Sequence, residues 1–225
     1  MTRHALHSAC EAFVRETMTG DAGHDLAHIR RVVTWAERLG DEEGADPEIV
    51  IPAAWLHDVV TVAKDSPDRA RASQIAAEVA SVWLRTQPFP ADKIPEVAHA
   101  IEAHSFSAGI VPRTVEARVV QDADRLDALG AIGIARCYAT GGVFGSQIVH
   151  PEDPVPGEMP SRELDDVRYA TDHFYVKLFA LPPTMQTLAG RAEAERRAAF
   201  IRTFLAQLAR ETGASQPALG ECSEG

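Results

Sequence analysis

The stretch AAWLHDVV, residues 53–60, places His57 and Asp58 side by side in an otherwise almost wholly apolar run. A buried ion without a partner is strongly destabilising, so this pair needs a compensating group. At helical spacing His57 shares an apolar stripe with Ala53 and Ala54, and we expect its imidazole to point inward. A lone buried histidine is usually a satisfied core residue. The adjacent carboxylate weakens that interpretation here.

Helical periodicity extends outward from this stretch over most of the chain, and no sustained alternating strand pattern interrupts it. It predicts helices over residues 5–18, 25–44, 47–63, 68–86, 92–104, 114–138, 164–181 and 187–212. The sequence therefore predicts an all-α protein. We expect one helical domain over residues 1–212 and a disordered tail over residues 213–225.

Residues 139–163 depart from this pattern, because glycine and proline are frequent there. The composition predicts a long irregular loop. Such loops in compact domains are often functional lids, and they are as often surface excursions without a role.

The composition bounds the class of protein. A chain of 225 residues with 45% apolar and 24% charged residues is typical of a soluble globular protein with one substantial core. The net charge of −11 argues against a general nucleic-acid-binding surface but allows one small anionic substrate in a locally basic pocket. No apolar run is long enough to span a membrane, so we expect no membrane partner.

The N-terminus and the cysteines indicate the compartment. The first residues contain no apolar segment followed by a small-residue cleavage site, so we expect no signal peptide. The three cysteines are far apart and form no CxxC pair, which disfavours a disulfide framework or a zinc ribbon. We expect a reduced cytosolic protein.

Two further segments place metal-binding side chains on faces that should be packed. His28 lies in HDLAHIRRV on a face with Val32, and Asp124 lies in QDADRLDALG on an alanine-rich stripe with Ala117. One divalent cation where these helices meet His57 and Asp58 would satisfy all of the polar groups at once. A buried histidine–aspartate hydrogen-bond network without metal is the alternative.

The types of ligand narrow the choice of metal. Two imidazoles and two carboxylates without a thiolate favour Mn²⁺, Fe²⁺, Co²⁺, Ni²⁺ or Mg²⁺ over a structural Zn²⁺. Mn²⁺ is the first candidate among them.

The order H…HD…D resembles that of the HD-domain metal-dependent phosphohydrolases. Four motifs, HDLAHIRRV, AAWLHDVV, IEAHSFSAGI and QDADRLDALGAIGIAR, are similar to the small bacterial YedJ/YpgQ-like branch of that superfamily. The similarity extends from about residue 20 to 210. It implies an HD-domain helical bundle with additional C-terminal helices, and the metal ligands His28, His57, Asp58 and Asp124. Asp124 is preferred over Asp122 because the last ligand of the family lies in the D-R-L position.

The resemblance implies a chemistry as well as a fold. A metal-activated water would attack phosphorus in a small phosphorylated substrate, with a nucleotide as the first candidate. The products would be a monophosphate and pyrophosphate from a triphosphate, or phosphate from a phosphomonoester. We expect no nucleic-acid partner. The oligomeric state stays open, and a homodimer is one option.

Nearby cations are candidates for binding phosphate. Lys64 and Arg69 follow the HD pair closely, and Arg31 and Arg125 flank the proposed ligands. Arginine suits phosphate because its planar guanidinium binds two oxygens at once. Each of the four is also explained as an ordinary solvated charge.

Other polar residues are candidates for proton transfer and for orienting the ligands. His104 stands at an expected helix end, and we interpret it as a general acid or a ligand to a second metal. Asp25 and Asp127 are candidates to orient ligating histidines or to position water. Phe106 and Phe144 are candidates to stack on a base, and equally they fit the core.

Three other functions compete with this one. A phosphodiesterase of cyclic nucleotides or alarmones is the nearest, although a GYP-type element is missing. A di-iron oxygenase built on an HD domain needs additional histidines, which His99 and His104 leave open. A non-catalytic nucleotide sensor is disfavoured by the intact ligand set.

Overall fold

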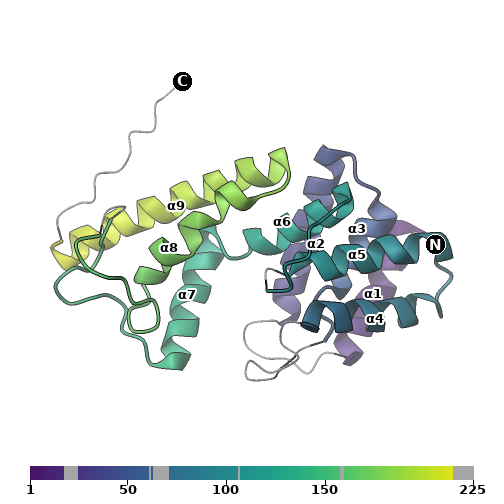
Figure 1. The fold of residues 1–225 in the computed structure, drawn as a ribbon, viewed down its shortest axis with the longest axis horizontal. Coiled ribbons are helices and arrows are strands. Elements are labelled where there is room, and N and C mark those ends of the chain that lie inside the picture. Colours follow the sequence, from purple (N-terminus) through teal and green to yellow (C-terminus); the bar gives the residue numbers. More distant parts are fainter. Residues whose placement is uncertain (18–24, 61, 63–70, 106, 158–159, 215–225) are drawn as a thin grey trace. The chain divides into compact units, whose positions relative to one another are not determined.

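The computed structural model describes residues 1–17, 25–60, 62, 71–105, 107–157 and 160–214. These residues form helices joined by turns and loops, and the only β pairing among them is an isolated bridge between Gln147 and Tyr169. The prediction of an all-α fold is confirmed. Contacts divide the chain into two compact units, residues 1–127 with 185–191 and residues 128–184 with 192–225 (Figure 1).

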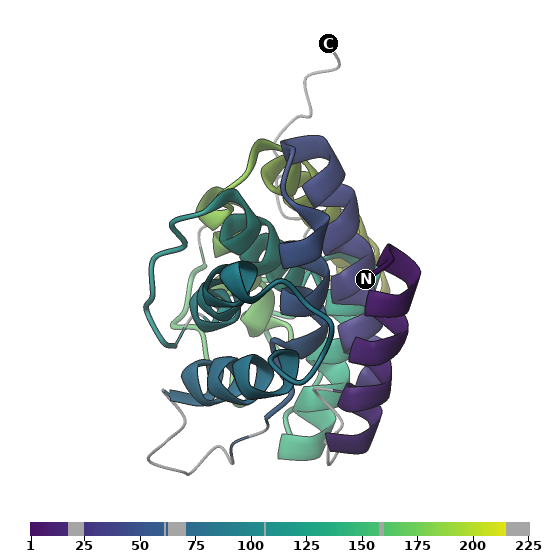
Figure 2. The ribbon, with the colours of Figure 1, turned by 90° about the vertical axis from the view of Figure 1, so that its right-hand side faces the viewer.

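The first unit is a helical bundle around one central helix. Its members are α1 (Arg3–Thr17), α2 (Leu26–Glu43), α3 (Pro47–Leu56), α4 (Ala72–Leu84), α5 (Ile94–His104) and α6 (Val115–Leu126). Helix α3 contacts α1, α2, α5 and α6. Every residue of α3 from Ile49 to Leu56 is buried, as expected for a helix that is apolar all round. Figure 2 shows α1 in dark purple at one edge of this bundle and α4 in blue at its lower edge.

Helix α3 begins as the sequence predicts and ends earlier. The Asp46 carboxylate accepts a hydrogen bond of 2.9 Å from the Glu48 N–H, and Pro47 takes the first helical position. The predicted continuation from residue 57 to 60 is wrong, because these residues form a turn after Leu56. In this turn Asp58 Oδ2 lies 3.5 Å from the Nε2 of His57.

The predicted helix over residues 114–138 is two helices. Helix α6 ends at Leu126, and α7 (Gly130–Phe144) begins at a glycine with φ +70° that favours a break in the helix. The alanine-rich helix face that holds Ala117 and Asp124 therefore ends with α6, and the predicted continuation of one helix to residue 138 is wrong.

The second unit contains α7, the short helix α8 (Asp172–Val176) and most of α9 (Leu188–Thr212). Two single 3₁₀ turns, η3 (Leu178–Ala180) and η4 (Pro182–Thr184), lie between α8 and α9. Helix α7 extends into the predicted loop 139–163 and stops at Gly145, which has φ +75°. The loop therefore begins later than predicted, and its role as a lid stays a prediction.

The predicted helix over residues 164–181 is mostly irregular, and a buried carboxylate explains why. Asp172 is fully buried and binds Arg162 through two contacts of 2.6 Å. It also accepts the N–H of Asp165 at 2.9 Å. These bonds fix residues 162–165 in a non-helical path that helix propensity cannot override.

Compact units are not by themselves independently folding domains, so a single domain over residues 1–212 stays a prediction. The predicted tail lies outside the described residues beyond position 214. Among the described helices, none combines the length and the apolarity that crossing a membrane requires.

Candidate metal centre

Two buried histidines present the same ring nitrogen. The Nδ1 of His57 donates to the carbonyl of Ala54 over 2.8 Å, and the Nδ1 of His104 donates to the carbonyl of Ile101 over 2.6 Å. A carbonyl oxygen can only accept, so in each neutral ring the proton lies on Nδ1. In its neutral form each ring therefore presents an unprotonated Nε2, the form in which imidazole binds a metal.

The third histidine is oriented by a carboxylate. The Nδ1 of His28 donates to Asp127 Oδ2 over 2.7 Å, which leaves Nε2 for the centre. Arg31 holds the same carboxylate with Nε at 2.6 Å and Nη2 at 3.0 Å. Such a carboxylate–histidine pair is the usual support of a metal-binding imidazole. Arg31 as the clamp on Asp127 was missed by the sequence reasoning, although its position three residues after His28 puts both on one helix face.

The carboxylates of Asp58 and Asp124 each lie beside the Nε2 atoms of both His28 and His57. The Nε2 atoms of His28 and His57 lie 3.4 Å apart. Asp58 Oδ2 lies 3.5 Å from the Nε2 of His57 and 3.8 Å from that of His28. Asp124 Oδ1 lies 3.4 Å from the Nε2 of His28 and 3.8 Å from that of His57. Ligand atoms about 2.1 Å from one ion are about 3.0 Å apart in octahedral geometry and about 3.4 Å apart in tetrahedral geometry, so these separations equal or slightly exceed those around a shared cation.

The electrostatics of the group call for a positive charge at its centre. Burial lowers the pKa of His28, but the hydrogen bonds and charges of Asp124 and Asp127 outweigh it and raise the pKa to about 9. Burial raises the pKa of Asp124, yet the hydrogen bond to His28 and the nearby imidazoles lower it to about 2. Two nitrogens facing each other at 3.4 Å also need a cation or a proton between them. The donor set therefore fits a divalent cation.

His104 adds a third imidazole to the edge of this group. Its Nε2 lies 3.5 Å from Asp58 Oδ1, and its ring is 4.9 Å from that of His57, edge to face. Burial lowers the pKa of His104, but the hydrogen bond and charge of Asp58 raise it above the ordinary value. His104 is thus placed to hold a proton beside Asp58.

His99 has a different partner. Its Nε2 accepts the backbone N–H of Arg113 over 3.0 Å. This bond uses the nitrogen that His28, His57 and His104 present to the centre. His99 is therefore explained as a satisfied residue of the bundle.

The remaining predicted residues have mixed positions. Asp25 caps α2, with its carboxylate accepting the backbone N–H of His28 at 2.8 Å. Arg125 is half-buried on α6, where its charge interacts with Asp122 and Asp124. Lys64, Arg69 and Phe106 lie outside the described residues.

Asp122 makes hydrogen bonds within the fold and does not face the histidines. It is fully buried and accepts hydrogen bonds from Gln186 N at 2.9 Å and from Thr187 N at 2.8 Å. The Thr187 hydroxyl adds a third bond of 2.7 Å. Asp122 therefore ties α6 to residues 185–191 of the same unit, while Asp124 faces the histidines.

Residues 25–129 match the HD domain family, and this range contains all four candidate ligands. Over 204 residues, 88% of this chain and 90% of its relative, the sequence is 33% identical to the protein YpgQ of Bacillus subtilis. The chain belongs to the HD-domain superfamily. Like the HD-superfamily hydrolases that it resembles, this HD-domain protein is a metal-dependent phosphohydrolase.

Solved structures of relatives extend the likeness over more than nine tenths of the chain. The structure of Bacillus subtilis YpgQ in complex with ADP is 32% identical, with a TM-score of 0.72 over 94% of this chain and 97% of YpgQ. An HD-superfamily hydrolase from Bacillus thuringiensis is 34% identical, with a TM-score of 0.73 over 95% of this chain and 100% of its own. A predicted HD-superfamily hydrolase from an uncultured Thermotogales bacterium is 27% identical, with a TM-score of 0.60 over 91% of both chains.

Proposed function

We propose that this HD-domain hydrolase acts on nucleotides and prefers Mn²⁺. The reaction is either cleavage of a nucleoside triphosphate to monophosphate and pyrophosphate or hydrolysis of a phosphomonoester. The observation that carries the proposal is that carboxylate oxygens of Asp58 and Asp124 each lie within 3.8 Å of the Nε2 atoms of both His28 and His57, which are 3.4 Å apart. The ADP complex of YpgQ supports a nucleotide as the substrate class.

The four converging residues are the proposed metal ligands. A divalent cation held there would acidify a water molecule and draw charge from a phosphate oxygen. The protein itself orients the proposed histidine ligands. Hydrogen bonds from the Nδ1 atoms of His28 and His57 fix both rings, so neither side chain has to reorganise when a ligand enters.

His104 is the proposed general acid. Asp58 raises its pKa against the effect of burial, so the ring carries a proton at higher pH than an ordinary histidine. The protonated Nε2 would donate its proton to the leaving oxygen, and the ring would then be a neutral imidazole. Asp127 is a positioning residue in this scheme, because it acts through His28. Asp25 has the same kind of role through the backbone of that residue.

Cations near the centre are the proposed phosphate-binding groups. Lys64, Arg69 and Arg125 remain candidates for this role by their closeness in sequence to the ligands. Arg31 was predicted with them. Its two bonds to Asp127 support a clamping role more strongly than phosphate binding.

The positions of the extra histidines bear on the competing oxygenase. His104 reaches the centre, whereas His99 is bonded to the Arg113 backbone. A di-iron site that needs both histidines is therefore less well supported than the hydrolase. Free thiols at Cys10 and Cys137 support a cytosolic setting for the reaction. We expect neither nucleic acid nor membrane as a partner, and a homodimer stays open.

The test is a metal-dependent hydrolysis screen. Metal-free protein receives Mn²⁺, Mg²⁺, Co²⁺, Ni²⁺ or Fe²⁺ with nucleoside mono-, di- and triphosphates, cyclic nucleotides and alarmones. Phosphate and pyrophosphate are assayed separately, so the product identifies the bond that breaks. We expect release with Mn²⁺ and none after Asp58→Ala.

Two controls make the screen decisive. Asp41→Ala removes an exposed carboxylate of α2 and should leave turnover unchanged. An oxygen electrode run in parallel with Fe²⁺ detects oxygenation. Metal binding without release from any nucleotide would refute the proposal, and oxygen uptake would establish the rival.

A further inference from the structure

The second unit contains a cavity that the metal centre does not use. Its volume is about 510 Å³, and every lining residue belongs to the second unit. We call it the α7–α8 cavity; its wall includes Arg136, Cys137, Thr140, Phe144, His173 and Lys177. A cavity of this size falls in the range of small-molecule sites.

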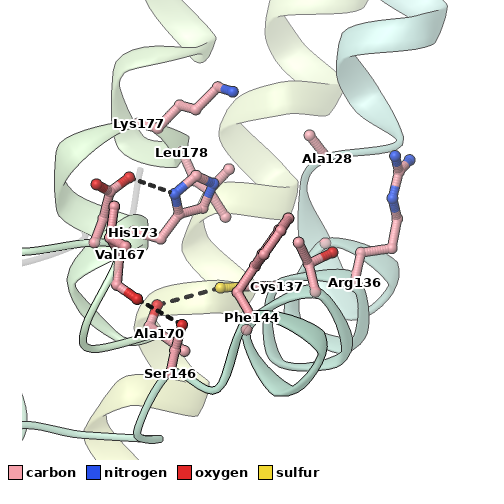
Figure 3. A pocket seen from close by; sticks show the side chains of 14 residues that line it. Ala128, Arg136, Cys137, Phe144, Ser146, Val167, Ala170, His173, Lys177 and Leu178 are labelled. Atoms are coloured by element: carbon pink, nitrogen blue, oxygen red, sulfur yellow. Dashed lines mark hydrogen bonds and ion pairs between the residues drawn. The ribbon is translucent and has the colours of Figure 1, made fainter. Parts of the chain in front are cut away.

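The wall is mostly apolar, and it includes one exposed aromatic ring. Ala170 and Leu178 are buried members of the wall, and Phe144 keeps 61% of its surface exposed. Figure 3 shows the Phe144 ring standing beside Cys137, between the α8 side of the cavity and Arg136. An exposed ring beside apolar surface offers a flat face on which another ring can stack.

Polar groups converge on one side of this wall. The His173 Nδ1 is 2.8 Å from Asp166 Oδ2, so this carboxylate is already engaged. No described residue hydrogen-bonds the other ring nitrogen, Nε2, and Figure 3 shows the imidazole directed into the cavity. Lys177 follows one helical turn later, with its N–H bonded to the His173 carbonyl at 3.0 Å. Among the described residues no carboxylate pairs with its ammonium.

The charges at the cavity oppose the charge of the chain. The protein carries 33 acidic and 22 basic residues, whereas the α8 side of the cavity wall presents the Lys177 ammonium beside one carboxylate, Asp166. That carboxylate is bound by His173. An ammonium without a carboxylate partner among the described residues, in a concave apolar site, attracts small anions.

We propose that the α7–α8 cavity binds a flat aromatic molecule that carries one carboxylate or phosphate group. The ring stacks on Phe144, and the anionic group binds Lys177 and the Nε2 of His173. A nucleotide and an aromatic acid share this chemistry. The site is a property of the second unit alone and does not rest on the proposed reaction of the metal centre.

The rate at which Cys137 is alkylated can report ligand binding in the intact chain. It lines the cavity, whereas Cys10 is fully buried and can be ignored as a reactive thiol. A Cys222→Ser background removes the third cysteine. Burial raises the pKa of the Cys137 thiol to about 11, so alkylation by N-ethylmaleimide is slow and easily timed by mass spectrometry.

Protection of Cys137 from alkylation tests the proposal. The probes are adenosine 5′-monophosphate, indole-3-acetate, adenosine as a ring without an anion, and inorganic phosphate as an anion without a ring. EDTA is present throughout, so binding that needs a metal does not contribute. We expect saturable protection by the nucleotide, by the aromatic acid or by both, which distinguishes the two sources. Adenosine and phosphate alone should protect much less.

Matched variants locate the protection. Lys177→Gln should weaken the apparent affinity about tenfold, as expected for loss of a charge-assisted bond. Thr140→Phe fills the cavity from an exposed position of α7 and should abolish protection, whereas Ala139→Phe on the next exposed position should not. Arg210→Gln, an exposed cation of α9 outside the cavity, controls for net charge. Protection that survives Thr140→Phe, or equal protection by phosphate alone, would overturn the proposal, as would no protection by either aromatic anion.

Discussion

His28 and Asp127 are joined by a hydrogen bond of 2.7 Å between Nδ1 and Oδ2, although 99 residues separate them in sequence. Both side chains are almost fully buried, at 2% and 4% exposure. The bond fixes which nitrogen of His28 faces the centre, and Arg31 holds the carboxylate in place. Orientation of a ligand thus comes from two residues that do not belong to the ligand set.

Replacing the orienting carboxylate should weaken metal binding. In Asp127→Asn the shape is retained, but the charge that supports His28 and pairs with Arg31 is lost. We expect Mn²⁺ affinity to fall by about 10- to 100-fold, the usual effect of losing such a partner. Isothermal titration calorimetry of the metal-free protein measures it. Asp41→Asn, an exposed carboxylate on α2, is the control, and equal affinities in both variants would contradict the role.

Substitutions of Asp122 and Asp124, which are two residues apart on α6, should have different effects: one on stability and the other on hydrolysis. Asp124→Ala removes a partly exposed proposed ligand, so metal-dependent hydrolysis should vanish while the unfolding midpoint in urea changes little. Asp122→Ala strips three hydrogen bonds from buried donors of Gln186 and Thr187. We expect that change to cost about 2–4 kcal/mol of unfolding free energy. Retained metal-dependent turnover in Asp124→Ala would show that the ligand assignment is wrong.

The ion pair between Arg162 and Asp172 should control the path of the chain before α8. Asp172 is fully buried, and its loss leaves the largely buried Arg162 guanidinium with one carboxylate partner, Asp153 at 3.2 Å, in place of two. Asp172→Asn should therefore lower the unfolding free energy by about 3–5 kcal/mol. Trypsin should also cleave faster after Arg162, whose side chain is released. Glu152→Gln changes an exposed carboxylate of the same loop, and it should leave both the stability and the cleavage rate as they are.

The clustering of the four proposed ligands could be predicted from sequence, because their polar side chains conflict with the apolar surroundings. His57 and Asp58 interrupt an apolar run, and His28 and Asp124 lie on faces that should be packed. Burial without a partner is unfavourable enough that a shared ion is the natural solution. The choice of Asp124 over Asp122 agrees with the geometry, since only Asp124 faces the histidines.

Helix ends were predicted poorly where tertiary contacts override local propensity. The break after Leu126 depends on Gly130, whose positive φ is not evident from an alanine-rich pattern. The irregular path at residues 164–171 depends on Asp172, which lies in a segment whose local sequence pattern predicts a helix. The partner of Arg31 lies 96 residues away, so no local pattern could identify it.

Asp25 offers a test of whether a predicted catalytic residue acts through the backbone alone. Its carboxylate accepts the N–H of His28 at the start of α2. If capping is its whole role, Asp25→Ser should preserve stability and metal affinity, because serine caps a helix equally well. Asp25→Ala should lose about 1 kcal/mol of unfolding free energy. Urea unfolding and turnover of both variants are measured together. Hydrolysis that is lost in Asp25→Ser at unchanged stability would instead give the carboxylate a direct part in the reaction, because the serine restores the cap without the charge.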